Sequence, residues 1–158
     1  MDTRSPERAH LDALDLSYRY LGMRDRTTAE VRAYLASKEV GAAAVEGALT
    51  ELQDQGYLND ARFAVAFAED RRNLDDWGSE RIGRRLQALG VEQELIDSAL
   101  TRDRDDELDA AVALLGRRFS DAPSDDRERQ RALGVLVRKG FDLDLSYEAI
   151  RSFASQRS

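Results

Sequence analysis

Arginines at helical spacing are the side chains of this sequence best suited to bind a partner. The first arginine set falls on one side of a predicted helix and comprises Arg81, Arg84 and Arg85. The second arginine set recurs near the end of the chain and comprises Arg127, Arg131 and Arg138, followed by Lys139. A guanidinium group pairs bidentately with a carboxylate or a phosphate. The two sets therefore predict contact with an acidic protein surface or with nucleic-acid phosphates.

The apolar positions of the same helices are predicted to lie opposite the arginines. In the later helix they are Leu133, Leu136 and Val137. A charged helix face is often only a solvated surface, so the solvated and the contact interpretations both stay open. Further contact candidates between and before these helices are Arg62, Arg71, Arg72 and Trp77. Trp77 is interpreted either as a half-buried packing residue or as an exposed interface anchor.

Residues that could support catalysis or hold a metal are few. The sequence has no cysteine, and His10 is its one histidine. It contains neither the G-x-x-x-x-G-K-(S/T) loop that cradles phosphates nor a G-x-G-x-x-G dinucleotide motif. We therefore expect no catalytic residue, no metal site and no cofactor, and a protein that works by binding.

The charge balance limits the class of partner. With 24 basic and 31 acidic side chains the formal net charge is −7, which disfavours non-specific binding to nucleic acid. No apolar run approaches the roughly 20 residues of a membrane span, and the first residues are polar. We expect a cytoplasmic protein without a membrane contact, and a monomer.

Helical periodicity and cap residues organise the sequence into nine short predicted helices. Thr27 and Glu30 match a capping box, Asn59 is suited to cap the next helix, and Gly56 is suited to end the preceding one. The acidic run at 103–109 is interpreted as a solvated linker and first helical turn, and the alternative is a contact with basic loops of a partner.

An internal repeat is the most informative feature of the sequence. A shift of 51 residues places Leu35 on Leu86, and a shift of 50 places Gly90 on Gly140. The register fails at Glu39, which falls on Gly90. We predict an all-α fold of three three-helix repeats at residues 9–58, 59–103 and 104–155. The alternative is a single helical bundle with accidental periodicity.

Several motifs, in order, resemble the RecX family, the bacterial regulators of the RecA recombinase. Residues 56–64, Gly-Tyr-Leu-Asn-Asp-Ala-Arg-Phe-Ala, resemble its signature G-Y-L-(D/N)-D-x-R-F-A. Residues 78–86 resemble its G-x-x-R-I-x-x-x-L segment, and residues 138–141 its (R/K)-(R/K)-G-F segment. The signature residues with an expected structural role are Gly56, Tyr57, Leu58, Asp60, Phe63, Gly78, Gly90, Gly140 and Phe141. We interpret residues 56–64 as the join between two repeats, with Arg62 as the residue best placed for a direct contact.

The resemblance implies an elongated, curved array of three tandem three-helix repeats. It also implies a protein that binds the RecA–single-stranded DNA filament in its groove. Such a protein inhibits ATP hydrolysis, strand exchange and filament extension by RecA. The alternative hypothesis is a single-stranded-nucleic-acid-binding module that competes with RecA for DNA, although the net charge predicts weak direct binding.

Overall fold

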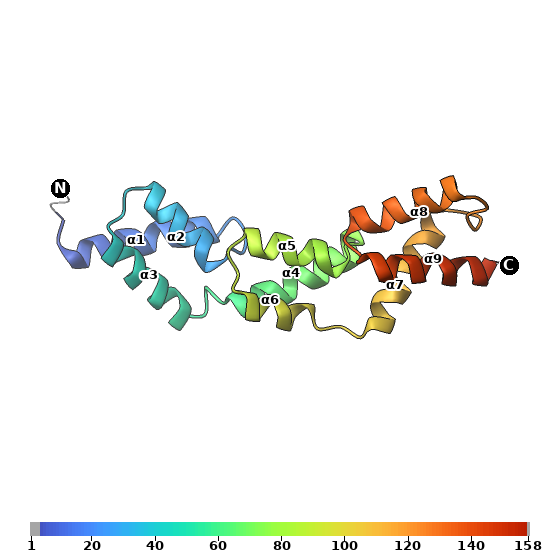
Figure 1. Cartoon of the computed structure of the whole chain (residues 1–158). Coiled ribbons are helices and arrows are strands. Elements are labelled where there is room, and N and C mark those ends of the chain that lie inside the picture. The colour runs from blue at the N-terminus through green and yellow to red at the C-terminus, as the bar shows by residue number, and fades with distance from the viewer. Residues whose placement is uncertain (1–3, 158) are drawn as a thin grey trace. The chain divides into compact units, whose positions relative to one another are not determined.

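The chain forms nine α-helices and no strand within residues 4–157, the part that the computed structural model describes (Figure 1). The helices are α1 (Pro6–Leu21), α2 (Thr28–Ser37), α3 (Ala42–Asp54), α4 (Asp60–Asp75), α5 (Ser79–Ala88), α6 (Gln93–Leu100), α7 (Arg104–Arg118), α8 (Asp126–Lys139) and α9 (Leu143–Arg157). They follow one another as three groups of three, so the predicted all-α repeat organisation is confirmed.

The described residues pack as two compact units. The N-terminal unit contains the residues up to Ala64 together with Leu86–Ile96. The C-terminal unit contains Val65–Arg85 together with the residues from Asp97 onward. The helices of the second repeat therefore contribute to both units.

The core of the N-terminal unit lies between α1, α2 and α3, which pack against one another (Figure 1). Apolar side chains from all three helices are removed from water here, and this burial is the main favourable contribution to folding. The buried residues are Ala13, Leu14, Val31, Leu35, Val45, Ala48, Leu49, Leu52 and Leu58.

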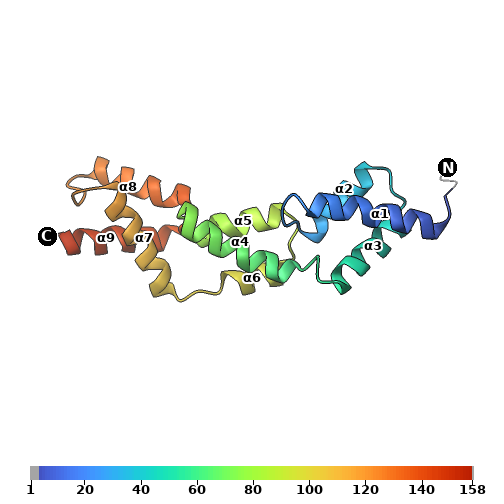
Figure 2. The ribbon, with the colours of Figure 1, turned by 180° about the vertical axis from the view of Figure 1, so that it is seen from behind.

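The core of the C-terminal unit lies between α7, α8 and α9 (Figure 2). Its largest fully buried side chains are Leu114, Leu115, Leu136, Leu145 and Phe153. One sequence prediction is wrong here, because Val137 is 43% exposed. Ala132 and Val135 take the core positions beside Leu136, since they lie on the side of α8 that faces α9.

The predicted helix starts and stops are largely confirmed. The Thr27 side chain accepts a hydrogen bond from the Glu30 backbone, and the Glu30 side chain accepts one from the Thr27 backbone. The Arg62 backbone N–H donates to Asn59 Oδ1 over 2.9 Å. Gly56 adopts a left-handed backbone with φ of 82°. These local signals therefore place the boundaries of α2, α3 and α4 correctly.

Candidate protein-interaction surface

The outer face of α5 presents two arginines without a polar partner among residues 4–157. Ile82 and Leu86 are fully buried and fix the inner side of this helix. Arg84 and Arg85, from the first arginine set, are exposed. Neither guanidinium group forms a hydrogen bond or an ion pair with any residue that the structure describes. Both are therefore available to an external acidic group.

Arg81, the third member of the first arginine set, has contacts within the chain. Its guanidinium carbon lies 4.2 Å from the centre of the Trp77 ring. Its Nη1 donates to the Arg138 carbonyl oxygen over 3.1 Å. This side chain connects the start of α5 to the end of α8.

Trp77 is half-buried, as one of its two interpretations predicted. Its ring meets the Phe67 ring edge-on, with 6.2 Å between centroids. The Arg71 guanidinium lies 5.9 Å from the Trp77 ring and also pairs with Asp75 over 2.6 Å. Trp77 thus packs between cationic and aromatic neighbours at the turn from α4 to α5.

All three members of the second arginine set are exposed on α8. The Arg131 guanidinium lies 5.7 Å from the Phe119 ring. Glu128 is the acidic residue of this face, and its carboxylate accepts hydrogen bonds from Ser124 N at 2.7 Å and Oγ at 2.9 Å. These bonds hold the pKa of Glu128 below its usual value. The carboxylate is thereby held at the first turn, and the arginines keep the face basic.

Lys139 and Arg72 both take part in contacts inside the C-terminal unit. Lys139 Nζ donates to the Asp75 carbonyl oxygen over 2.9 Å. Arg72 is half-buried beside Ser79, and burial lowers the pKa of its guanidinium group. The positive charge of Arg102 adds to this effect.

The sequence prediction missed the role of Glu107, which lies in the acidic run. Glu107 is buried and accepts hydrogen bonds from Ser79 N at 2.9 Å and Ser79 Oγ at 3.1 Å. Arg102 Nη1 donates to the same carboxylate over 2.9 Å. A carboxylate from the third repeat therefore caps α5 of the second repeat.

Asp60 makes an equivalent contact one repeat earlier. Its Oδ1 accepts hydrogen bonds from Thr28 N at 2.8 Å and from Thr28 Oγ1 at 3.1 Å. A hydroxyl residue at the start of a second helix, followed by an acid in the first turn of the next repeat, was the available sequence signal. This signal cannot be recognised within a single repeat, because the partners are 28 and 32 residues apart.

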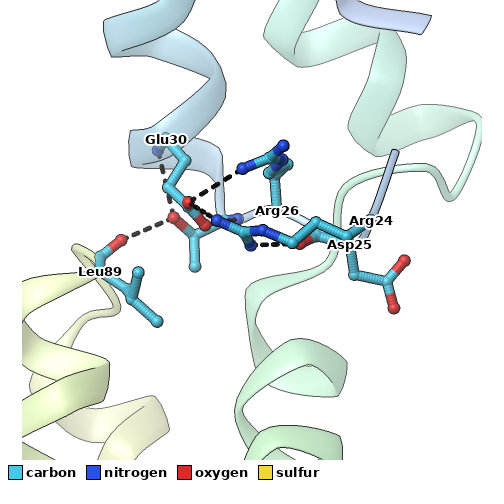
Figure 3. Close-up of polar contacts among 6 residues, drawn as sticks. Arg24, Asp25, Arg26, Glu30 and Leu89 are labelled. Carbon is cyan, nitrogen blue, oxygen red and sulfur yellow. Dashed lines mark hydrogen bonds and ion pairs between the residues drawn. The ribbon is translucent and has the colours of Figure 1, made fainter. Parts of the chain in front are cut away.

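The start of α2 carries a polar cluster that contacts the end of α5 within the N-terminal unit (Figure 3). Thr27 Oγ1 donates to the Leu89 carbonyl oxygen over 2.6 Å. The Glu30 carboxylate pairs with Arg24 over 2.8 Å and with Arg26 over 3.8 Å. The Arg26 guanidinium also stacks on the Tyr20 ring at 3.9 Å. These arginines hold the Glu30 carboxylate beside Thr27, which makes the contact with the second repeat.

The signature segment at 56–64 forms the connection from α3 to α4, as the sequence predicted. Leu58 is buried, whereas Tyr57 is 59% exposed and meets the Tyr18 ring edge-on. Arg62 Nη2 donates to the Gly56 carbonyl oxygen over 2.7 Å. Phe63 is half-buried. Arg62 thus stabilises the turn and keeps part of its side chain at the surface.

No group of three or more histidine, cysteine, aspartate or glutamate side chains is arranged to hold a metal ion among residues 4–157. In the same part of the chain no helix is long and apolar enough to cross a lipid bilayer.

Models of three RecX domains match this chain in order. The first three-helix domain matches residues 13–52, the second residues 59–100 and the third residues 105–150. The chain belongs to the RecX family. The resemblance inferred from the motifs is thereby confirmed.

Individual RecX proteins match most of the chain. The regulatory protein RecX of Leptothrix cholodnii is 31% identical over 144 residues, which cover 91% of this chain and 90% of that protein. The RecX of Bacillus cytotoxicus is longer: it is 30% identical over 142 residues, which cover 88% of this chain but 51% of that protein. The crystal structure of RecX from Lactobacillus salivarius has the same fold, with a TM-score of 0.82 at 22% identity over 93% of this chain and 97% of that one.

Proposed function

We propose that this RecX protein binds the RecA–single-stranded DNA filament in its groove and inhibits the activities of RecA. The inhibited activities are ATP hydrolysis, strand exchange and filament extension. Membership of a family of regulatory proteins supports a binding role. The helical repeats support contact with more than one RecA subunit, because several weak contacts on one array add avidity.

The contact surface that we propose consists of the exposed arginines of α5 and α8. The observation that supports it is the division of the basic contact candidates into two groups. Arg62, Arg71, Arg72, Arg81 and Lys139 have partners inside the chain and hold its helices and turns together. The candidates that are exposed and have no ion pair in the described structure are Arg84, Arg85, Arg127, Arg131 and Arg138.

The chemistry of this surface suits carboxylates on RecA or phosphates of the DNA that RecA holds. Guanidinium groups pair with either. The net charge of −7 makes the protein surface the better partner for the chain as a whole, since long-range repulsion opposes free DNA. We therefore expect only weak direct contacts with single-stranded DNA, made to the strand that the RecA filament holds.

Charge reversal tests the proposed surface. We expect the double variant Arg84→Glu/Arg85→Glu to bind RecA filaments about tenfold more weakly than the unmodified chain, a loss of about 1.4 kcal/mol. The measurement is fluorescence anisotropy of the labelled chain with RecA on single-stranded DNA. The matched control is Arg151→Glu, which changes another exposed arginine with no partner in the described structure, on α9. Equal affinity of the double variant and the control would remove α5 from the interface.

The competing hypothesis, a module that takes single-stranded DNA from RecA, predicts a different salt response. Its affinity for free DNA would fall steeply with salt concentration, because phosphate contacts release counterions. We expect free single-stranded DNA of the same length to bind far more weakly than the filament at every salt concentration. Comparable affinities for free DNA and filament would favour the competitor.

A further inference from the structure

The second helices of the three repeats, α2, α5 and α8, end in the same kind of turn. Val40 N donates to Leu35 O, Val91 N to Leu86 O and Phe141 N to Leu136 O, each over 3.1 Å. In each turn one residue has a left-handed backbone. That residue is Glu39 after α2, with φ of 61°, Gly90 after α5, with φ of 85°, and Gly140 after α8, with φ of 100°.

At both glycines the start of another second helix packs directly on the turn. A Cβ atom on Gly90 would overlap the Cβ of Ala29, which lies in the first turn of α2. A Cβ atom on Gly140 would overlap the Cβ of Arg81, in the first turn of α5, and lie 2.6 Å from its backbone nitrogen. Within the C-terminal unit, Gly78 N also donates to Lys139 O over 2.7 Å. A turn that receives a helix in this way has no room for any side chain.

The turn after α2 carries a side chain instead. Glu39 is exposed, and it adopts the left-handed conformation that residues with a Cβ rarely take. A helix start could not approach this turn as α2 and α5 approach the glycine turns, because the Glu39 Cβ would occupy the contact point. The same residue broke the register of the repeat in the sequence.

Helix α8 differs from α2 and α5 in length. α2 and α5 have 10 residues each, whereas α8 has 14. The first backbone N–H groups of α2 and α5 are bound by groups of the following repeat, Asp60 and Glu107. The third residue of α8 is capped by its own N-cap, Glu128 N to Asp125 Oδ1 over 2.8 Å, just as Glu30 N of α2 is capped by Thr27 Oγ1.

We infer that Glu39 closes the turn after α2, and with it this protein, against end-to-end association with a second copy of itself. The contact in question is a helix start packed on the turn of another repeat. Formed between two copies, it would join them head-to-tail and would not close into a ring. Such contacts generate open filaments. A turn that cannot accept a neighbouring helix prevents this growth. This inference is independent of the function proposed above.

Alanine substitutions at three left-handed glycines test the steric basis of the inference. Gly90→Ala and Gly140→Ala add both backbone strain and an overlap with a docked helix. Gly56→Ala is the matched control, because Gly56 has φ of 82° and no atom beyond its two chain neighbours lies within 4 Å of its would-be Cβ. We expect the midpoint of thermal unfolding to fall by at least about 5 °C more for Gly90→Ala and Gly140→Ala than for Gly56→Ala. Equal losses would show that a side chain fits beneath a docked helix, and would overturn the role of Glu39.

Two further measurements test the closure itself. We expect Glu39→Gly to leave the unfolding midpoint unchanged or raised, because no docked helix depends on that turn. We expect sedimentation velocity of the unmodified chain to give a single monomeric species across a hundredfold concentration range. A concentration-dependent oligomer that Glu39→Arg abolishes would overturn the inference, because the α2 end would then be a contact between copies.

Discussion

At the residue scale, the function of a charged side chain in this protein is set by what lies beside it. The sequence identified the arginines, but it could not separate Arg81, which contacts Trp77 and Arg138, from Arg84 and Arg85, which have no partner in the described structure. One of the two Arg81 contacts joins residues 57 positions apart in the chain. Helical spacing alone places all three on one helix side.

Glu107 gives the sharpest test at this scale. We expect Glu107→Ala to lower the free energy of unfolding by about 3 kcal/mol, because Arg102 loses its buried partner and the Ser79 N–H its acceptor. The measurement is denaturation by urea followed by circular dichroism. Asp109→Ala is the matched control, since Asp109 is an exposed acid of the same helix, and it should change stability by less than about 0.5 kcal/mol. Equal effects of the two substitutions would show that Glu107 is only a solvated charge.

At the element scale, most of the fold could be predicted from the sequence. Cap residues and glycines act within a few residues of where they stand, so Thr27, Asn59 and Gly56 mark their helix ends in the sequence itself. The assignment of Val137 to the core of α8 was wrong because apolar residues three and four positions apart on this helix form two neighbouring rows. Periodicity alone does not decide which row is buried. The contact with α9 selects the stripe that contains Ala132 and Val135.

Thr27 connects a helix start to the neighbouring repeat. Its removal should therefore lower the free energy of unfolding by more than the removal of an ordinary cap. We expect Thr27→Ala to cost about 2 kcal/mol, because it removes the bond to the Glu30 backbone and leaves Leu89 O without its donor. Thr50→Ala is the control, since the Thr50 hydroxyl donates only within α3, to Glu46 O. The unfolding free energies of both variants provide the comparison. A Thr27→Ala protein as stable as Thr50→Ala would contradict this account of the first junction.

At the scale of the whole molecule, the three repeats are similar in their turns and different in their surfaces. The second and third helices of each repeat share a core pattern, and this made the tandem organisation visible in the sequence. The carboxylates that join successive repeats were not visible, because each pairs with a hydroxyl residue of the preceding repeat. The exposed arginines of α5 and α8 take no part in these joins, and they form the contact surface that we propose.

The rate of ATP hydrolysis by RecA on single-stranded DNA, measured while the purified chain is added, tests the central proposal most directly. We expect the rate to fall as the chain is titrated, and the Arg84→Glu/Arg85→Glu variant to require about tenfold more protein for the same inhibition. A hydrolysis rate that stays constant up to a large excess of the unmodified chain over RecA would contradict the proposal.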